Sequence, residues 1–155
     1  MRIGHGYDVH RLAEGLPFTL GGVVIPHTKG FVAHSDGDVL IHAIIDALFG
    51  AAGMPDIGAH FPDSDVRYKG VSSIALLTEC VCKVRSAGFE IEYIDSTVIA
   101  QAPKIGVHIP AMREQLACAL RISVDQINIK ATTEEKLGFT GTGEGVAAHA
   151  VCLLK

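Results

Sequence analysis

The chain has 155 residues and a mass of 16.4 kDa, the size of one ordinary domain that exposes roughly 7,500 Å² when folded. Its 13 basic and 17 acidic side chains give a net charge of −4, which excludes the basic surface that nucleic-acid-binding proteins use. A hydrophobic content of 48% excludes disorder, and the apolar runs are too short to span a membrane.

The first part of the chain predicts short strands. Residues 2–10 predict one strand. Two three-residue runs, 18–20 and 23–25, flank Gly21 and Gly22, and a Gly-Gly pair between such runs is typical of a hairpin turn.

Three helices are indicated by composition and by stop signals. We expect the first over residues 38–52, ended by Gly53. The second is expected over 71–87, with a left-handed cap at Gly88, and the third over 109–121.

The remaining strands alternate with these helices. β-Branched and aromatic residues predict strands over 90–100 and 126–133. The largely apolar stretch 145–154, which follows the glycine-dense turn GFTGTGEG, predicts a strand buried on both faces. We therefore expect an α+β fold, with a single domain over residues 1–155 and a mixed sheet packed against helices.

Neither the N-terminus nor the cysteines indicate export. The start MRIGHGYDVH lacks an apolar h-region, so we expect a cytoplasmic protein, in a bacterial cytosol or, as a processed form, in a plastid stroma. Cys80, Cys82, Cys118 and Cys152 form no C-x-x-C pair, and we expect reduced thiols in the core.

The negative charge is concentrated in one segment. Residues 30–66 contain six aspartates and neither lysine nor arginine, whereas the rest of the chain sums to +2. His34, His42 and His60 are interspersed among these carboxylates. Such a mixture of acids and imidazoles indicates a bound cation.

Two stretches supply ligands for that cation. In a strand, Asp8 and His10 point to the same face. The helix over 38–52 is apolar nearly all round, and therefore buried, except for a polar stripe on one face. That stripe consists of Asp38, His42 and Asp46. Two histidines and one carboxylate leave an open coordination position, which is typical of catalytic zinc and is shared by nonhaem Fe(II).

Two interpretations of the stripe stay open. In the first, Asp38 or Asp46 orients the ring of His42 as a metal ligand. In the second, His42 is a core histidine that is hydrogen-bonded to one of these carboxylates, and the D-x-H pair is accidental.

Groups suited to anions lie in the other half of the chain. Lys104 and Lys130 accompany the later strands, and Lys136 precedes the glycine-rich loop 138–145. Exposed amides, threonine hydroxyls and lysines bind phosphates, and Glu135 suits Mg²⁺ among phosphate oxygens. No Walker A motif is present, and an irregular hairpin turn is the alternative for this loop.

Five motifs cover the chain in order: GHGYDVH, AHSDGD, FPDSD, IAQAPK and KATTEEKLGFTGTGEG. With them the sequence resembles the 2-C-methyl-D-erythritol 2,4-cyclodiphosphate synthase family of the non-mevalonate isoprenoid pathway. The resemblance implies a homotrimer with an α+β fold and three active sites at subunit interfaces. It implies a lyase in which the 2-phosphate of 4-diphosphocytidyl-2-C-methyl-D-erythritol 2-phosphate attacks the β-phosphorus and releases CMP, with neither water nor a covalent enzyme intermediate.

The resemblance also implies roles by position. Asp8, His10 and His42 hold Zn²⁺ or another divalent transition metal, and Glu135 holds Mg²⁺ or Mn²⁺ on the diphosphate. His34 and Thr133 stabilise the transition state. The implied substrate-binding residues are Asp8, Val9, His10, His34, Ser35, Asp56, Ile57, Gly58, Phe61, Pro62, Asp63, Ser64, Asp65, Ala100, Gln101, Ala102, Pro103, Lys104, Ile105, Gly106, Thr132, Thr133, Glu134, Glu135, Phe139 and Thr142. Of these, the residues implied to surround the erythritol part are Ser35, Asp56, Ile57, Gly58 and Phe61 to Asp65. Those implied to surround the cytidine part are Ala100 to Gly106, Thr132 and Thr133.

Two places depart from the family's pattern. Thr142 stands where the family usually has Arg, as GFTGRGEG, and this removes a cation from any phosphate contact there, including a prenyl diphosphate site on the trimer axis. Residues 105–107 lack the proline that is common near the cytosine loop.

Two other functions are compatible with the motifs. A zinc-dependent phosphohydrolase would use the same ligands, a metal-bound hydroxide and Asp56 or Asp63 as base. A non-catalytic trimer that binds prenyl phosphates would keep a structural metal. Lys104 and the Thr132–Thr133–Glu135 group favour the cyclase, because a simple hydrolase needs no nucleotide loop, and Thr142 counts against the prenyl-binding trimer.

Overall fold

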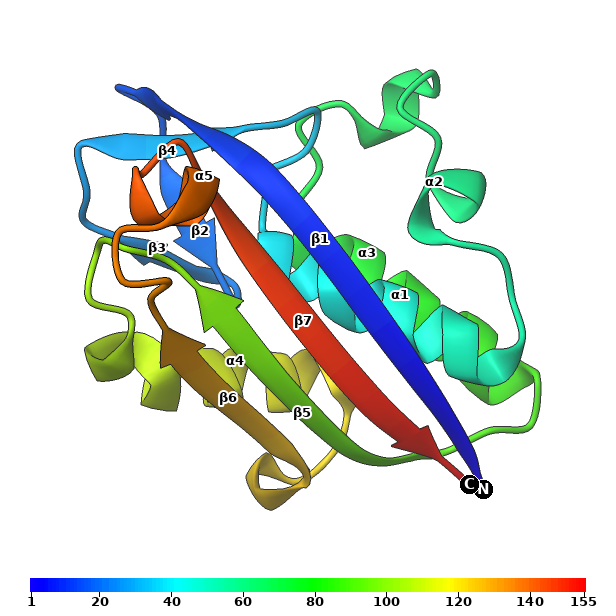
Figure 1. The fold of residues 1–155 in the computed structure, drawn as a ribbon. Helices are drawn as coiled ribbons and strands as arrows, with labels where there is room; N and C mark the ends of the chain where they lie inside the picture. The colour runs from blue at the N-terminus through cyan, green and yellow to red at the C-terminus, as the bar shows by residue number, and fades with distance from the viewer.

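The computed structural model describes residues 1–155 and shows an α+β fold with a mixed sheet, as expected (Figure 1). The strands are β1 Arg2–Glu14, β2 Phe18–Leu20, β3 Val23–Ile25, β4 Lys29–Val32, β5 Ile91–Ile99, β6 Ile127–Thr132 and β7 Gly145–Leu154. The helices are α1 Val39–Ala52, α2 Ile57–His60, α3 Ser73–Ser86, α4 Ile109–Leu120 and α5 Gly138–Gly141, and there are short 3₁₀ turns at Val66–Tyr68, Gly106–His108 and Val124–Gln126.

Five strands form one sheet in the order β4-β1-β7-β5-β6, and β2 and β3 form a separate hairpin. β7 runs antiparallel to both β1 and β5, whereas β5 and β6 are parallel and are connected through α4. β1, β5 and β6 therefore all run in one direction. The loops that follow β5 and β6 emerge at the same edge of the sheet.

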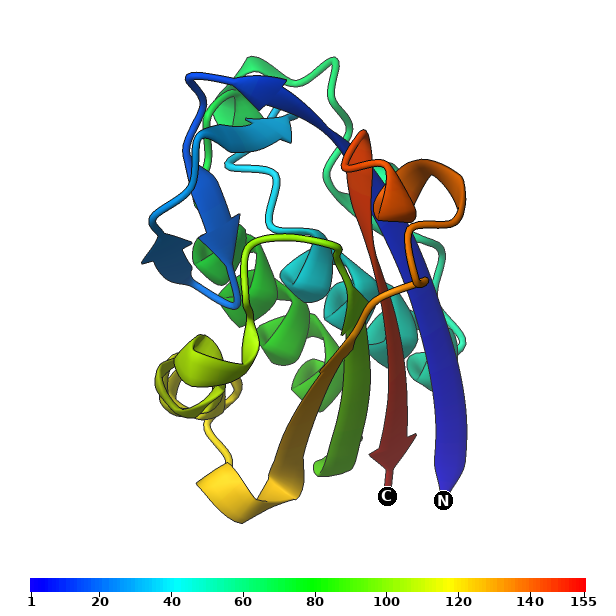
Figure 2. The ribbon, with the colours of Figure 1, turned by 60° about the vertical axis from the view of Figure 1, so that its left-hand side comes forward.

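The helices α1, α3 and α4 cover one face of the sheet, and the opposite face carries only the short α5 near one end (Figure 2). Thirty-seven buried residues form one hydrophobic core between the sheet and the helices. The accessible surface of 7490 Å² agrees with the area expected for this mass. None of the helices is long and apolar enough to cross a bilayer.

Most predicted elements are confirmed within two residues of their ends, and the hairpin and β7 match residue for residue. The first strand was predicted too short, because β1 continues to Glu14, where its second half pairs with β4. β4 was missed because four residues that include a glycine show no readable period. The glycine-dense turn contains the one-turn helix α5.

Two predictions about burial are wrong. β7 is not buried on both faces, because His149 and Val151 are exposed and alternate with buried residues, and one face of the sheet has no helical layer (Figure 2). Not all cysteines lie in the core: Cys80 and Cys152 are buried, whereas Cys82 and Cys118 are exposed. On α3, a side chain two residues beyond Cys80 points away from the sheet. All four thiols are unpaired.

Candidate active site

Two glycines let α1 approach β1 closely enough to join the predicted ligands. A Cβ at Gly4 would lie 2.0 Å from the Ala47 carbonyl oxygen, and a Cβ at Gly6 would lie 1.9 Å from that of Ala43. Asp8 follows on the same face of β1, and His42 precedes Ala43 on α1. The backbone contact at Gly6 therefore brings His42 beside the strand.

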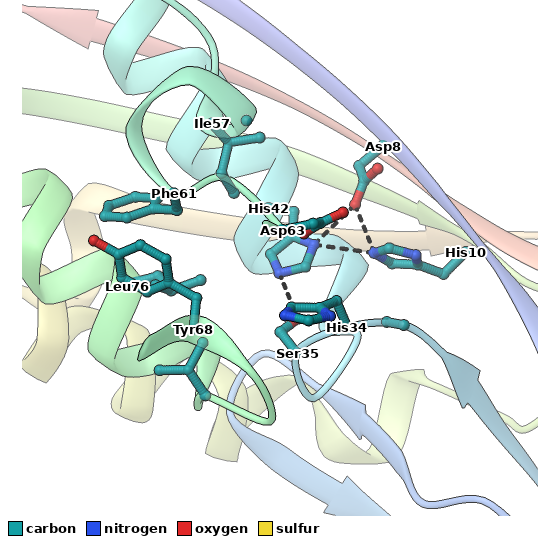
Figure 3. A pocket seen from close by; sticks show the side chains of 13 residues that line it. Asp8, His10, His34, Ser35, His42, Ile57, Phe61, Asp63, Tyr68 and Leu76 are labelled. Carbon is teal, nitrogen blue, oxygen red and sulfur yellow. Dashed lines mark hydrogen bonds and ion pairs between the residues drawn. The ribbon is translucent and has the colours of Figure 1, made fainter. Parts of the chain in front are cut away.

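Asp8, His10 and His42 converge, as the sequence predicts (Figure 3). Asp8 Oδ2 lies 3.1 Å from His10 Nε2 and 3.1 Å from His42 Nδ1, and the two nitrogens are 3.0 Å apart. Tetrahedral ligands about 2.1 Å from a zinc ion are about 3.4 Å from one another. The triangle fits such an ion after small movements of the side chains, so these three residues form a cluster able to hold a divalent metal.

Hydrogen bonds within the cluster shift two pKa values. Burial works to raise the pKa of Asp8, but hydrogen bonds from His10 and His42 outweigh burial and hold this pKa well below its usual range. Burial works to lower the pKa of His42, but the hydrogen bond to Asp8 and the nearby carboxylates outweigh it and raise this pKa. The site thus favours a negative Asp8 beside a positive group.

Neither of the other polar residues of the α1 stripe orients His42, contrary to the first interpretation above. Asp38 is fully buried and accepts hydrogen bonds from the backbone N–H groups of Gly21, Gly22 and Ile41, so it joins the hairpin turn to the start of α1. Burial nevertheless raises the pKa of Asp38 to about 6. Asp46 accepts from the Ile57 N–H at 2.8 Å and holds the start of α2. The core-histidine alternative, which needs the same bonds, is wrong as well.

Two serines contact the ring nitrogen of His42 that faces away from the cluster. Ser73 Oγ lies 2.9 Å from His42 Nε2, and Ser35 Oγ lies 3.3 Å from it. Ser73 is the first residue of α3 and is fully buried. Ser73 could not be identified from the sequence, because a serine near the start of a helix is common in proteins.

The cluster lies at one side of a pocket of about 250 Å³. Nine predicted site residues line this pocket (Figure 3): Asp8, His10, His34, Ser35, His42, Ile57, Gly58, Phe61 and Asp63. His34 is exposed at this pocket, and Phe61 is buried. The pocket also has an apolar wall that the motifs did not indicate, formed by Ala33, Tyr68, Val71 and Leu76.

Other predicted residues near this pocket do not line it. Asp56 is the N-cap of α2 and accepts from the Ala59 N–H, and Asp65 pairs with Arg67 at 2.6 Å. Pro62 and Ser64 lie in the same loop, outside the pocket lining. Asp56 and Asp65 thus shape the loop that carries Asp63.

A second pocket, of about 590 Å³, lies where β5 and β6 end. It is lined by Ala100, Gln101, Pro103, Lys104, Ile105, Gly106, Thr132, Thr133 and Glu135, all predicted, and by Val107, Ile109 and Ala131, which were not. The parallel pairing of β5 with β6 brings these two loops together.

The turn after β6 is held in an uncommon backbone conformation. Glu135 and Lys136 have φ of 52° and 67°, a left-handed region that costs non-glycine residues energy and recurs at ligand sites. The Glu135 N–H donates to Thr133 Oγ1, the Thr133 hydroxyl donates to Glu135 Oε1, and the Lys136 N–H donates to Gln101 Oε1. These bonds present the Glu135 carboxylate beside the Thr133 hydroxyl at the exposed rim.

The remaining predicted residues lie elsewhere. Val9 and Phe139 line a small depression on the face of the sheet without a helical layer, and Ala102 and Thr142 line another beside α5. Glu134 accepts a hydrogen bond from Thr140. The Thr142 hydroxyl donates to Glu144 Oε1 at 2.9 Å. One copy of the chain therefore distributes its predicted site residues over several separate surfaces.

Comparisons with known proteins agree over the whole chain. A family model described as the YgbB family matches residues 1–155. A 2-C-methyl-D-erythritol 2,4-cyclodiphosphate synthase from Azotobacter vinelandii is 60% identical over 154 residues, which cover 99% of this chain and 98% of that protein. One from Pseudomonas entomophila is 58% identical over the same coverage.

Solved structures give the same result. A CDP-bound 2C-methyl-D-erythritol-2,4-cyclodiphosphate synthase is 40% identical and superposes with a TM-score of 0.92, covering 99% of this chain and 100% of that one. The bifunctional IspDF from Campylobacter jejuni is 47% identical with a TM-score of 0.96, but the chain spans only 42% of that longer protein.

Proposed function

The chain belongs to the YgbB family, and from that membership we propose that it is a 2-C-methyl-D-erythritol 2,4-cyclodiphosphate synthase like its relatives. Its substrate is 4-diphosphocytidyl-2-C-methyl-D-erythritol 2-phosphate, and its products are the cyclodiphosphate and CMP. The convergence of Asp8 Oδ2, His10 Nε2 and His42 Nδ1 beside a pocket carries this proposal. Three ligand atoms from two elements at mutual distances near 3 Å meet the requirement for a cation among phosphates.

The reaction exchanges one phosphorus–oxygen bond for another. An oxygen of the 2-phosphate forms a bond to the β-phosphorus, the bond from that phosphorus to the bridging oxygen breaks, and CMP leaves with the bridging oxygen. The reaction consumes no water and needs no protein nucleophile. The protein therefore contributes mainly by positioning the two phosphates and by neutralising charge.

The pocket beside the cluster suits the methylerythritol part. A divalent cation such as Zn²⁺, held by Asp8, His10 and His42, would neutralise β-phosphate oxygens. His34 lies at the same pocket and donates to the reacting phosphate. Ser35 and Asp63 bind hydroxyl groups of the substrate, and the buried side chain of Phe61 supplies an apolar surface to the pocket.

The second pocket suits the cytidine diphosphate part. The loop from Ala100 to Gly106, which lines this pocket except at Ala102, binds the base and ribose together with Thr132. Glu135 would hold Mg²⁺ or Mn²⁺, which would neutralise charge on the diphosphate, because its carboxylate lies at the exposed rim and accepts a hydrogen bond there from the Thr133 hydroxyl. Thr133 donates to the phosphate oxygens that gain charge as CMP leaves.

We also propose that the active form is a homotrimer with sites between copies. The two pockets share no lining residue, although one substrate must occupy both. The face of the sheet without a helical layer exposes large apolar side chains: Ile3, Tyr7, Val9, Tyr93 and Val151. A patch of this kind is typical of an interface, and a cyclic assembly sets different surfaces of neighbouring copies against each other.

The ³¹P NMR spectrum of the product tests the proposed function. With divalent metal, we expect the single signal of CMP and two mutually coupled phosphorus signals of a cyclic diphosphate, while the 2-phosphate ester signal of the substrate disappears. Retention of the 2-phosphate ester signal beside a second, linear phosphate would instead establish the phosphohydrolase. Binding of prenyl phosphates without CMP release would favour the non-catalytic trimer, which the uncharged Thr142 does not support.

A further inference from the structure

His42 uses its two ring nitrogens in different directions. Nδ1 lies 3.1 Å from Asp8 Oδ2 and faces the cluster. Nε2 lies 2.9 Å from Ser73 Oγ, at the buried start of α3. A neutral imidazole carries a proton on one nitrogen and a lone pair on the other, so the partner of Nε2 decides whether Nδ1 can bind a cation.

The hydroxyl proton of Ser73 is already committed to another residue. The Ser73 hydroxyl donates to Asp36 Oδ1 in a short contact, and the Ser73 N–H donates to Asp36 Oδ2 at 2.9 Å. A serine has only one hydroxyl proton, so toward His42 its oxygen acts as an acceptor. When His42 is neutral, its single proton therefore lies on Nε2, and the lone pair of Nδ1 faces Asp8 and His10 Nε2, which is 3.0 Å away. The hydrogen bond from Nδ1 to Asp8 forms only when the ring carries a second proton.

Asp36 is itself held in place by the backbone. The Asp38 N–H donates to Asp36 Oδ1 at 3.2 Å, and the Asp36 N–H donates to the Val71 carbonyl. The carboxylate is thus fixed between the segment that begins α1 and the segment that begins α3. Ser35 also approaches His42 Nε2, at 3.3 Å, but its hydroxyl oxygen accepts from the Gly37 N–H and does not contact Asp36.

We propose that Asp36 and Ser73 are positioning residues that fix the His42 ring in the Nε2–H tautomer and thereby present Nδ1 to the cation. The proposal rests on the cation site of the proposed function. Neither residue belongs to the predicted ligand or substrate-binding set, and neither touches a reacting atom. Hydrogen-bonded partners of this kind, behind a ligating histidine, typically change metal affinity by 10–100-fold.

The first readout is the tautomer itself, in protein freed of metal by a chelator and kept at alkaline pH. In ¹⁵N-histidine spectra of the wild type, we expect the His42 signals of a protonated Nε2 and an unprotonated Nδ1. In Ser73→Ala and in Asp36→Asn, we expect both signals to move toward the values of a mixture of tautomers. Unchanged His42 signals in both variants would overturn the proposal, whether or not the wild type binds zinc.

The second readout is the zinc dissociation constant, measured by chelator competition. We expect Ser73→Ala and Asp36→Asn to bind one zinc per chain with about 10–100-fold weaker affinity. Ser72→Ala is the matched control, because Ser72 precedes Ser73 and its side chain makes no capping hydrogen bond. His42→Ala should lose the zinc altogether.

Two further measurements distinguish a folding defect from a defect in cation binding. Asp36→Asn keeps the shape of the side chain but replaces one acceptor oxygen by an NH₂ group, so without metal we expect one cooperative thermal transition at a somewhat lower temperature than in the wild type. Affinity in both variants within twofold of the wild type would overturn the proposal. A wild type that binds no zinc at this cluster would overturn the proposed function instead, and the ¹⁵N spectra would still decide the tautomer.

Discussion

At the scale of single residues, the cluster joins a carboxylate and two imidazoles that lack a lysine or arginine partner. Asp8 Oδ2 contacts both rings, and each contact is 3.1 Å long. Without a metal, the charge of Asp8 is balanced only when a ring carries an additional proton. The protonation of the metal-free protein is therefore coupled across these residues.

Asp8→Asn should destabilise the metal-free protein in a defined pH window. The folded-state pKa of Asp8 is lowered, so its contribution is present above the unfolded value near 3.8 and is lost in acid. The folded-state pKa of His42 is raised, so its contribution is present below the unfolded value near 6.5 and is lost as pH rises through the folded value. We expect a loss of about 2 kcal/mol between these values and a smaller loss at alkaline pH.

Urea unfolding in the presence of a chelator, inside the window and well above it, measures this difference. Asp63→Asn is the control, because Asp63 lies at the same pocket and makes no hydrogen bond to a histidine. An Asp8→Asn loss that does not change with pH would contradict the coupling between Asp8 and His42.

The convergence of Asp8, His10 and His42 could be predicted from the sequence, whereas the residues that hydrogen-bond to the outer side of His42 could not. Strand alternation places Asp8 with His10, and a buried helix must turn a polar residue such as His42 toward a polar partner. Asp38 and Asp46 share the helical face of His42, but backbone N–H groups take their oxygens. The packing of the elements decides which carboxylate accepts a hydrogen bond from a buried N–H group. The spacing of polar and apolar residues along the sequence does not predict this packing.

At the scale of elements, the contact between α1 and β1 brings Asp8 and His10 together with His42. The side chains that would separate these two elements are missing at Gly4 and Gly6. Both glycines lie on the same face of β1 as Asp8. The alternation of residues along β1 therefore places the glycines against α1 and places Asp8 beside His42.

Gly6→Ala should therefore impair both stability and metal binding. Its Cβ would lie 1.9 Å from the Ala43 carbonyl oxygen, so α1 has to move away from β1. We expect a loss of about 3 kcal/mol in the free energy of unfolding. Zinc binding should weaken, because His42 moves with α1.

Gly50→Ala is the matched control within α1. A Cβ there meets only the His5 carbonyl oxygen at 3.9 Å, an ordinary contact, and alanine favours a helix by about 1 kcal/mol. Urea unfolding and zinc titration compare the two variants. Equal effects of the two substitutions would contradict the role of the close approach.

The elements with strong patterns were predictable, and the short ones were not. Long helices and strands carry many residues in one period, as α1 and β7 do. β4, α2 and α5 have four residues each, and their positions depend on contacts with other elements. The first strand was predicted too short for the same reason, because its extension pairs with β4.

At the scale of the whole molecule, the charge and the apolar surface are both unevenly distributed. The acidic segment 30–66 contributes His34, His42 and Asp63 to the pocket beside the Asp8–His10–His42 cluster. The second pocket is lined by residues from the rest of the chain, which is nearly neutral. The face of the sheet without a helical layer leaves large apolar side chains exposed in a single copy. Both the separation of the two pockets and the exposed apolar face are explained if neighbouring copies pack through this face and each site combines pockets from two copies.

Val151→Glu should separate the copies. Val151 lies on this face, 38% exposed, and a charge there would be buried without a partner in the trimer. We expect sedimentation equilibrium to give three times the chain mass of 16.4 kDa for the wild type and the mass of one chain for the variant. The variant should also lose activity.

Val24→Glu is the control for this substitution, because Val24 is 68% exposed on the separate β2–β3 hairpin. Its mass and activity should match those of the wild type. A Val151→Glu protein that keeps the wild-type mass would contradict the assignment of the interface to this face.

The source of the attacking oxygen tests the proposed activity most directly. We expect that the reaction run in ¹⁸O-enriched water, with products analysed by mass spectrometry, leaves both CMP and the cyclic product unlabelled, because the 2-phosphate of the substrate supplies the oxygen. One ¹⁸O atom in CMP or in a linear phosphate product would show that water attacks phosphorus, and would contradict the cyclase.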